Sequence, residues 1–146
     1  MTYKSIADLL SAAKQQKKKI SQLILADQAK EMEKTTAEVY AQMENSFDVM
    51  CESVVHGMDP KQKSTSGLTG GEGYKMQTYA QKTSGGLSGI FLTRAMSRAL
   101  AVSGCNASMG KIVATPTAGS CGILPGCLVS LYEDKSFDKK DIVMSI

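Results

Sequence analysis

Apolar and polar positions alternate with helical spacing along most of this 146-residue chain. The clearest pattern covers residues 20–56, which contain neither Gly nor Pro and in which apolar side chains recur every three or four positions. That spacing predicts the buried stripe of one long helix over these residues, and the alternative is a helix broken near Thr35–Thr36. Gly57 and the pair Asp59–Pro60 predict its end, because glycine favours a helix C-terminus and proline prevents the helix from resuming.

A shorter helix is predicted before this segment. Ser5 is a suitable N-cap, and Asp8 follows three residues later, where an acidic side chain favours a helix start. The basic run Lys17–Lys19 is interpreted as a solvated turn between two helices rather than as an interaction patch.

Glycine and proline divide the chain into two parts. All 13 glycines and all three prolines follow His56, so residues 1–57 form a helix-rich arm and residues 58–146 a part with glycine-rich loops. Apolar spacing in the second part predicts helices over 74–81, 87–102 and 123–132, and another from residue 138 onward. Strand-like alternation is scarce, so the expected fold class is all-α: a helical domain with a long N-terminal helix and glycine-rich loops between later helices.

The loop from Gly110 to Gly126 is the segment of greatest chemical interest. It combines hydroxyl side chains with Pro116 and with Gly119 and Gly122, for which we expect backbone dihedrals that other residues avoid. Amides and hydroxyls leading into an apolar helix would suit a small carboxylate bound at the helix N-terminus. The alternative is a tight connection between helices whose glycines serve only packing.

Residues 64–75 form a second loop rich in glycine and hydroxyl side chains. A phosphate-binding loop is not supported, because Lys75 is not followed by Ser or Thr. The loop could instead offer amides and hydroxyls to a polar ligand, or it could be a simple linker.

Composition excludes several classes of function. The net charge is +3, aromatic residues make up 5% of the chain and Trp is absent, which argues against a nucleic-acid surface. No apolar run is long enough to cross a membrane, and the N-terminus lacks a signal peptide, so the expected location is cytoplasmic. In that reducing compartment the four cysteines are not expected to form disulfides.

Familiar catalytic and metal-binding signatures are absent. The chain has no Cys-x-x-Cys motif. Cys105, Cys121 and Cys127 could together hold a metal, but no second ligand pair stands at a familiar spacing. Cys121 could be a reactive thiol at a helix N-terminus or a small packing residue. His56 could be a base or a histidine favoured by the helix C-terminus.

Five short motifs in order give the chain a resemblance to a known family. They are SGLTGG at 66–71, LSG at 87–89, NASMG at 106–110, ATPTAGS at 114–120 and PG at 125–126. With the long polar N-terminal helix, their order and spacing resemble the α subunit or α domain of the iron–sulfur-dependent bacterial L-serine dehydratases. The resemblance covers the N-terminal half of that essentially all-helical domain. The apolar end at Ile146 accordingly suggests a segment of a longer polypeptide.

The resemblance implies an enzyme of amino-acid catabolism and gluconeogenesis, a lyase that converts L-serine to pyruvate and ammonia by β-elimination. Its iron would act as a Lewis acid on the serine hydroxyl while a base removes the α-proton. The family's [4Fe-4S] cluster is held by cysteines in sequence contexts that do not occur here, so no metal ligand is expected in this segment. Implied partners are L-serine, a β subunit or β domain, and further copies in an oligomer, with no nucleic acid and no membrane.

The resemblance also implies that the two loops hold the substrate. The expected substrate-binding residues are Ser66, Gly67, Thr69, Gly70, Gly71, Thr115, Pro116, Thr117, Ala118, Gly119 and Ser120. Position 72 is Glu where the family often has Asp, and position 118 is Ala where some members have Asn. The catalytic residues are unknown, and the isolated segment is expected to be inactive.

Two alternatives belong to other functional classes. The same scaffold could serve a related L-cysteine desulfidase, which turnover of serine and of cysteine would distinguish. The chain could also be a non-catalytic assembly module whose long helix mediates contact between subunits.

Overall fold

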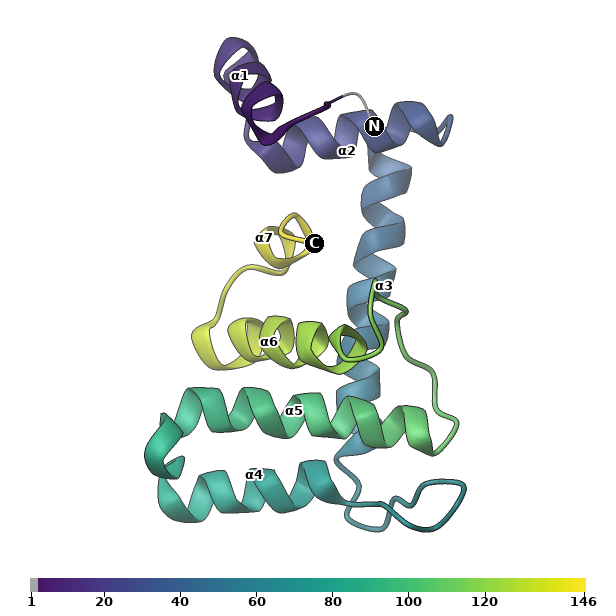
Figure 1. The fold of residues 1–146 in the computed structure, drawn as a ribbon, viewed down its shortest axis with the longest axis vertical. Helices are drawn as coiled ribbons and strands as arrows, with labels where there is room; N and C mark the ends of the chain where they lie inside the picture. Colours follow the sequence, from purple (N-terminus) through teal and green to yellow (C-terminus); the bar gives the residue numbers. More distant parts are fainter. Residues whose placement is uncertain (1–2) are drawn as a thin grey trace. The chain divides into compact units, whose positions relative to one another are not determined.

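A computed structural model describes residues 3–146, which contain seven α-helices, one 3-10 helix and no strand (Figure 1). The predicted all-α fold is therefore confirmed. The elements are α1 (Ile6–Gln16), α2 (Ile20–Glu31), α3 (Thr36–Gly57), α4 (Glu72–Thr83), η1 (Gly86–Ser88), α5 (Gly89–Ala107), α6 (Ser120–Lys135) and α7 (Lys139–Val143). None of these helices has the length and hydropathy of a membrane span.

Local capping explains where α1 and α3 begin. The Ser5 hydroxyl accepts a hydrogen bond of 3.1 Å from the backbone N–H of Asp8, as the sequence predicts. At the break between α2 and α3, the Thr35 hydroxyl accepts a bond of 3.2 Å from the N–H of Glu38. The Glu38 carboxylate in turn accepts one of 2.8 Å from the N–H of Thr35. This reciprocal pair satisfies two N–H groups at the start of α3. The prediction of one long helix over 20–56 is therefore wrong, because α2 ends at Glu31 and α3 begins at Thr36, next to the Thr35–Thr36 break that was the alternative.

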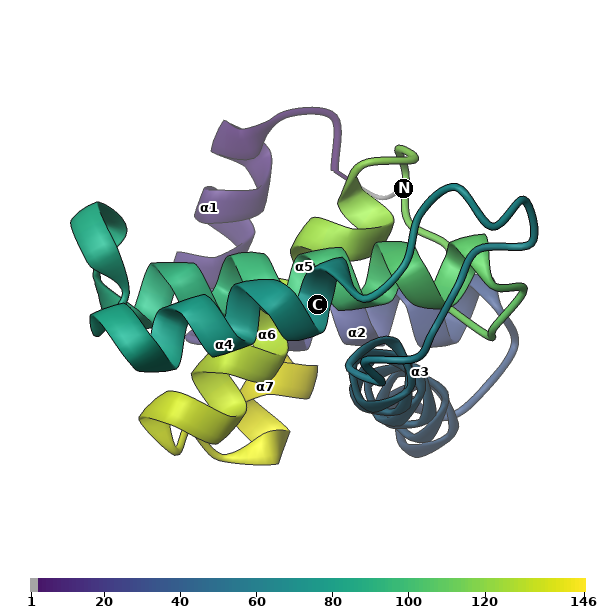
Figure 2. The ribbon, with the colours of Figure 1, turned by 90° about the horizontal axis from the view of Figure 1, so that it is seen from below.

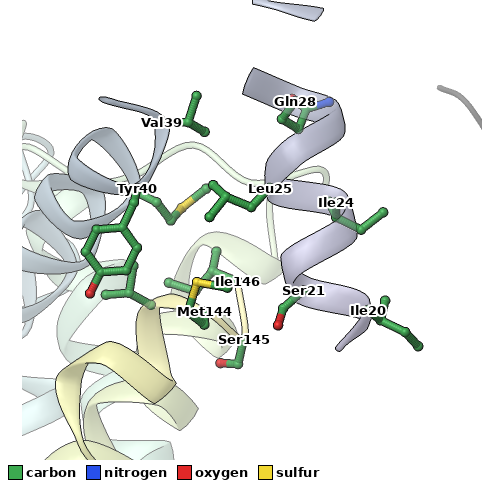
Figure 3. Close-up of a pocket in the computed structure, with 12 residues that line it drawn as sticks. Ile20, Ser21, Ile24, Leu25, Gln28, Val39, Tyr40, Met144, Ser145 and Ile146 are labelled. Carbon is green, nitrogen blue, oxygen red and sulfur yellow. The ribbon is translucent and has the colours of Figure 1, made fainter. Parts of the chain in front are cut away.

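Contacts within the chain separate two compact units, one formed by residues up to 45 together with 143–146 and the other by 46–142. In the first unit α1 packs on α2. An apolar groove of about 670 Å³ lies between α2, the beginning of α3 and the last four residues. Figure 3 shows its lining side chains, among them Leu25, Tyr40 and Ile146.

In the second unit α5 lies between α4 and α6, and consecutive helices run in opposite directions (Figure 1). The same three helices are seen from below in Figure 2. The part of α3 beyond residue 45 contributes the fully buried ring of Phe47, which meets the Tyr132 ring edge-on at 5.6 Å between centroids. The other buried apolar side chains of this core include Met50, Val54, Ala80, Ala95, Val102, Leu128 and Val129.

Glycines allow the helices of this unit to approach closely. A Cβ atom at Gly126 would lie 2.8 Å from the carbonyl oxygen of Ala95, and one at Gly122 would lie 2.9 Å from that of Ala99. A Cβ atom at Gly73 of α4 would lie 2.8 Å from Ala101. These distances are shorter than normal carbon contacts, so α5 can pack against α4 and α6 only because these positions lack side chains.

Candidate functional site

The two glycine-rich loops lie at the same end of the α4–α5–α6 layer (Figure 1). This placement follows from helix direction, because α4 begins, α5 ends and α6 begins at that end. Residues 58–71 lead into α4, and residues 108–119 connect α5 to α6. Within residues 3–146 the hydrogen bonds of these loops run inside each loop or to neighbouring helix ends, and none joins 66–71 to 115–120.

The loop before α6 is closed by its own hydroxyl groups. The Ser120 hydroxyl accepts a hydrogen bond of 3.1 Å from the N–H of Thr117, and the Thr117 hydroxyl accepts one of 3.2 Å from the N–H of Ser120. The Thr115 hydroxyl is also hydrogen-bonded to that of Ser120. Directly after this hydrogen-bonded turn, α6 begins at Ser120 and not at Ile123 as predicted.

Two backbone groups of this loop remain available to a ligand. The N–H groups of Ala118 and Gly119 donate to no acceptor within residues 3–146, and both residues are exposed at the N-terminus of α6. A Cβ atom at Gly119 would meet no atom of residues 3–146 within 4 Å, so the described part of the chain leaves open space beside these amides. An exposed helix N-terminus with unpaired N–H groups attracts anions.

The expectation of unusual dihedrals at Gly119 and Gly122 is wrong. Gly119 has φ −70° and ψ −34°, which is ordinary helical geometry, and Gly122 lies inside α6 and is not among the glycines with positive φ. Gly122 is explained by its close contact with α5, whereas neither backbone geometry nor local packing requires glycine at 119.

The loop at 66–71 owes its glycines to local structure. Gly67 and Gly71 both have φ +74°, a conformation that glycine adopts without strain. Gly67 closes a turn onto the carbonyl of Ser64, and Gly71 precedes the first residue of α4. A side chain at Gly70 would collide with the backbone oxygen of Gln62. Positive φ at Gly67 and Gly71 and close packing at Gly70 thus account for all three glycines.

Side chains also fix this loop. Thr69 pairs with Ser64 through two hydrogen bonds, and Thr65 donates to the carbonyl of Ala107 at the end of α5. The Glu72 carboxylate accepts a bond of 2.8 Å from the N–H of Gly70, which lowers the pKa of Glu72. Ser66 is exposed and its hydroxyl contacts that of Ser64.

The four cysteines differ in environment. The Thr115 hydroxyl donates to the sulfur of Cys121 at 3.4 Å, and this hydrogen bond is the main reason that the pKa of the Cys121 thiol is lowered. Burial, with help from Glu133 and Asp48, raises the pKa of Cys51 to about 11. Burial also raises the pKa of Cys105, while Cys127 is exposed. Among the described residues, no three His, Cys, Asp or Glu side chains lie close enough together to hold a metal ion.

A cluster formed by His56, Gln62 and Ser108, beside the loop that leads into α4, was not predicted from the sequence. The Gln62 side-chain nitrogen lies 3.0 Å from Nδ1 of His56 and 3.0 Å from the Ser108 hydroxyl, which links the end of α3 to the end of α5. Nothing in the spacing of these residues indicates the contact, because 46 positions separate Gln62 from Ser108. Two signals in the sequence bear on it: Ser108 lies in the 106–110 motif, and His56 was a candidate base.

The family model and the relatives that match this chain are all described as the alpha chain of a serine dehydratase. The family model described as serine dehydratase alpha chain matches residues 15–146. The chain is 36% identical over 131 residues to the probable L-serine dehydratase, alpha chain, of Bacillus subtilis (strain 168), covering 90% of this chain and 43% of that protein. It is 37% identical over 125 residues to the L-serine dehydratase, alpha chain, of Peptoniphilus asaccharolyticus, covering 85% and 42% respectively. The chain therefore spans less than half the length of these curated relatives, and no solved structure matches it.

Proposed function

We propose that this chain, which belongs to the serine dehydratase alpha chain family, forms part of an L-serine ammonia-lyase that converts L-serine to pyruvate and ammonia. Support comes from the names of the two relatives, whose matches cover most of this chain. The structural observation that carries the proposal is the pair of unpaired backbone N–H groups at Ala118 and Gly119.

In this proposal the N-terminus of α6 holds the carboxylate of L-serine. Two backbone donors and the positive end of a 16-residue helix form an anion site whose geometry is fixed before the ligand arrives. Thr115, Thr117 and Ser120 act by holding the turn, since their hydroxyls bond to one another. Pro116 restricts the backbone that leads into it.

The loop at 66–71 completes the proposed substrate region from the same end of the helix layer. Ser66, Gly67, Thr69, Gly70 and Gly71 shape its backbone, and Ser66 offers an exposed hydroxyl. We propose that the substrate or another part of the complete enzyme bridges this loop and the 115–120 loop, which lie at the same end of the helix layer.

The [4Fe-4S] cluster implied by the family does not fit the cysteines of this chain. They lie on α3, α5 and α6, and no group of three potential ligands converges within residues 3–146. We propose that the complete enzyme ligates the cluster outside this segment, and we assign no step of the elimination to it here. A β subunit or β domain, assembly into an oligomer and a cytoplasmic location are further parts of the proposal.

The proposal is tested by comparing Gly119→Val with Cys121→Ala in the complete, assembled enzyme. We expect Gly119→Val to lower kcat/KM for L-serine at least about tenfold, because the isopropyl group would occupy the space beside the two amides. Helical φ and ψ at Gly119 and open space around it should leave folding intact. Cys121→Ala should have little effect.

Two results would contradict this assignment. If Gly119→Val retained full activity while Cys121→Ala abolished it in folded protein, the thiol and not the amide pair would carry the function. If the complete enzyme turned over L-cysteine and not L-serine, the substrate assignment would be wrong.

A further inference from the structure

A polar hollow of about 510 Å³ lies where α3 ends and α5 ends, within the unit formed by residues 46–142. It is separate from the N–H groups of Ala118 and Gly119, because none of its residues belongs to the 115–120 loop. Its lining residues are Val55, His56, Asp59, Gln62, Lys63 and Ser108.

Opposite charges line this hollow without neutralising each other. Asp59 and Lys63 are both exposed, and within residues 3–146 no ion pair joins them. One carboxylate oxygen of Asp59, Oδ1, accepts a hydrogen bond of 2.8 Å from the N–H of Lys61, which fixes the carboxylate and leaves Oδ2 for a ligand. A ligand with a single charge would meet one attractive and one repulsive group, whereas a zwitterion can satisfy both.

His56 adds a hydrogen-bonding ring nitrogen. Its Nδ1 lies 3.0 Å from the side-chain nitrogen of Gln62. Because Gln62 engages Nδ1, the ring nitrogen that His56 can offer a ligand is Nε2.

Packing holds the base of the hollow in place. The Ser108 hydroxyl accepts from Gln62 and donates to the carbonyl of Cys105 at 2.9 Å, which orients the amide from the side of α5. On the other side, Gly70 lies so close to the Gln62 backbone that a Cβ atom there would collide with it. The donors and the carboxylate are thus positioned by α3, by α5 and by the loop before α4.

We propose that this hollow binds a free amino acid, with its carboxylate at Lys63 Nζ and His56 Nε2–H and its ammonium group at Asp59. Charge-assisted hydrogen bonds of this kind are the strong ones in small-ligand sites. The inference goes beyond the proposed lyase activity, because it concerns a second site on different residues and requires no turnover.

The single histidine of the chain provides the reporter. The 146-residue chain is labelled with ¹⁵N-histidine, and the imidazole resonances are followed by NMR during titration with L-serine. We expect the Nε2–H tautomer before titration and a saturable shift during it. L-lactate, which lacks the ammonium group, and ethanolamine, which lacks the carboxylate, should each bind about tenfold more weakly.

Matched variants test the residues. Lys63→Ala and Asp59→Asn should each raise the dissociation constant for L-serine about tenfold, whereas Lys61→Ala should leave it unchanged, because the Lys61 side chain does not line the hollow. Circular dichroism confirms that each variant retains its helix content.

The absence of a saturable shift with L-serine, or equal dissociation constants for wild type and Lys63→Ala, would overturn the proposal. Binding of L-lactate as tight as that of L-serine would overturn the role of Asp59. None of these results depends on lyase turnover, which is tested separately by Gly119→Val.

Discussion

The guanidinium of Arg98 on α5 donates a hydrogen bond of 2.6 Å to the carboxylate of Asp134 on α6. Only 7% of the Arg98 side chain and 13% of the Asp134 side chain are exposed, so the ion pair lies largely inside the helix packing. Arg98 also donates to the hydroxyl of Ser130, and Arg94 reaches Asp134 at 3.1 Å. Asp134 therefore balances two arginines at the α5–α6 interface.

Replacing Asp134 with Asn should destabilise the folded chain by about 3 kcal/mol, because Arg98 would lose its buried carboxylate partner and keep only the half-exposed Glu133. Urea unfolding measures this change. Glu133→Gln is the matched control: Glu133 also binds Arg98, at 2.7 Å, but half of its side chain is exposed, so a loss of less than about 1 kcal/mol is expected. Equal losses for the two variants would contradict the buried role of Asp134.

The same pair predicts how stability depends on pH. The hydrogen bond from Arg98 lowers the pKa of Asp134 below its ordinary value of 3.8. Its stabilising contribution is complete well above 3.8 and is lost as the pH falls through the lower folded-state pKa. In an unfolding series across acidic pH, the stability difference between wild type and Asp134→Asn should narrow as the solution is acidified below 3.8. A difference that stays constant would show that Asp134 titrates alike in both states.

Adding one methyl group at Gly126 should destabilise the α5–α6 pair. The new carbon would lie 2.8 Å from a backbone oxygen and 2.9 Å from the Ala99 side chain, so the helices would have to separate. We expect Gly126→Ala to lower the free energy of unfolding by about 1–3 kcal/mol. Gly119→Ala, which meets open space, should change it little. If Gly126→Ala left the free energy of unfolding unchanged, the two helices would tolerate a wider spacing.

The cysteines should react with iodoacetamide in a definite order near neutral pH. Cys121 should be alkylated before Cys51 and Cys105, because its lowered pKa gives more thiolate and the other two pKa values are raised. Mass spectrometry of peptides gives the rates. Thr115→Val should slow the alkylation of Cys121 several-fold, because it removes the hydroxyl that stabilises the thiolate. Faster labelling of Cys51 would show that its surroundings are more open than the structure indicates.

Anaerobic reconstitution with iron and sulfide should give no stoichiometric cluster on this chain, because its potential ligands do not converge within the described residues. Iron and sulfide analysis after desalting checks this. Stable retention of about four irons per chain would show that the cluster ligands have been misplaced.

The helices were largely predictable from the sequence because their signals are local. The Thr35 cap lies three residues from its glutamate, and the apolar stripe of α3 repeats within each turn, so both can be read without knowledge of the fold. Helix ends were less accurate: α5 extends to Ala107, beyond the predicted 102. The last turns of α5 are held partly by contacts from Thr65 and Gln62, which lie far away in the sequence.

The site was harder to predict because its decisive features are non-local. Gly70 and Gly119 look alike in the sequence, but Gly70 is required by the nearby Gln62 backbone and Gly119 has open space around it. The partnership of Arg98 with Asp134 joins residues 36 positions apart, so helical spacing could place Arg98 on a face but could not identify what faces it.

The hydrogen-bonded hydroxyls in the turn before α6 also limit how a ligand can be held there. The hydroxyls of Thr115, Thr117 and Ser120 already bond to one another. A ligand that bound one of these hydroxyls would replace one hydrogen bond by another, with little net change in enthalpy. The N–H groups of Ala118 and Gly119 have no acceptor within residues 3–146, so a ligand that binds them displaces only water. Attraction at this helix end is then mainly electrostatic, and affinity there should fall as ionic strength rises.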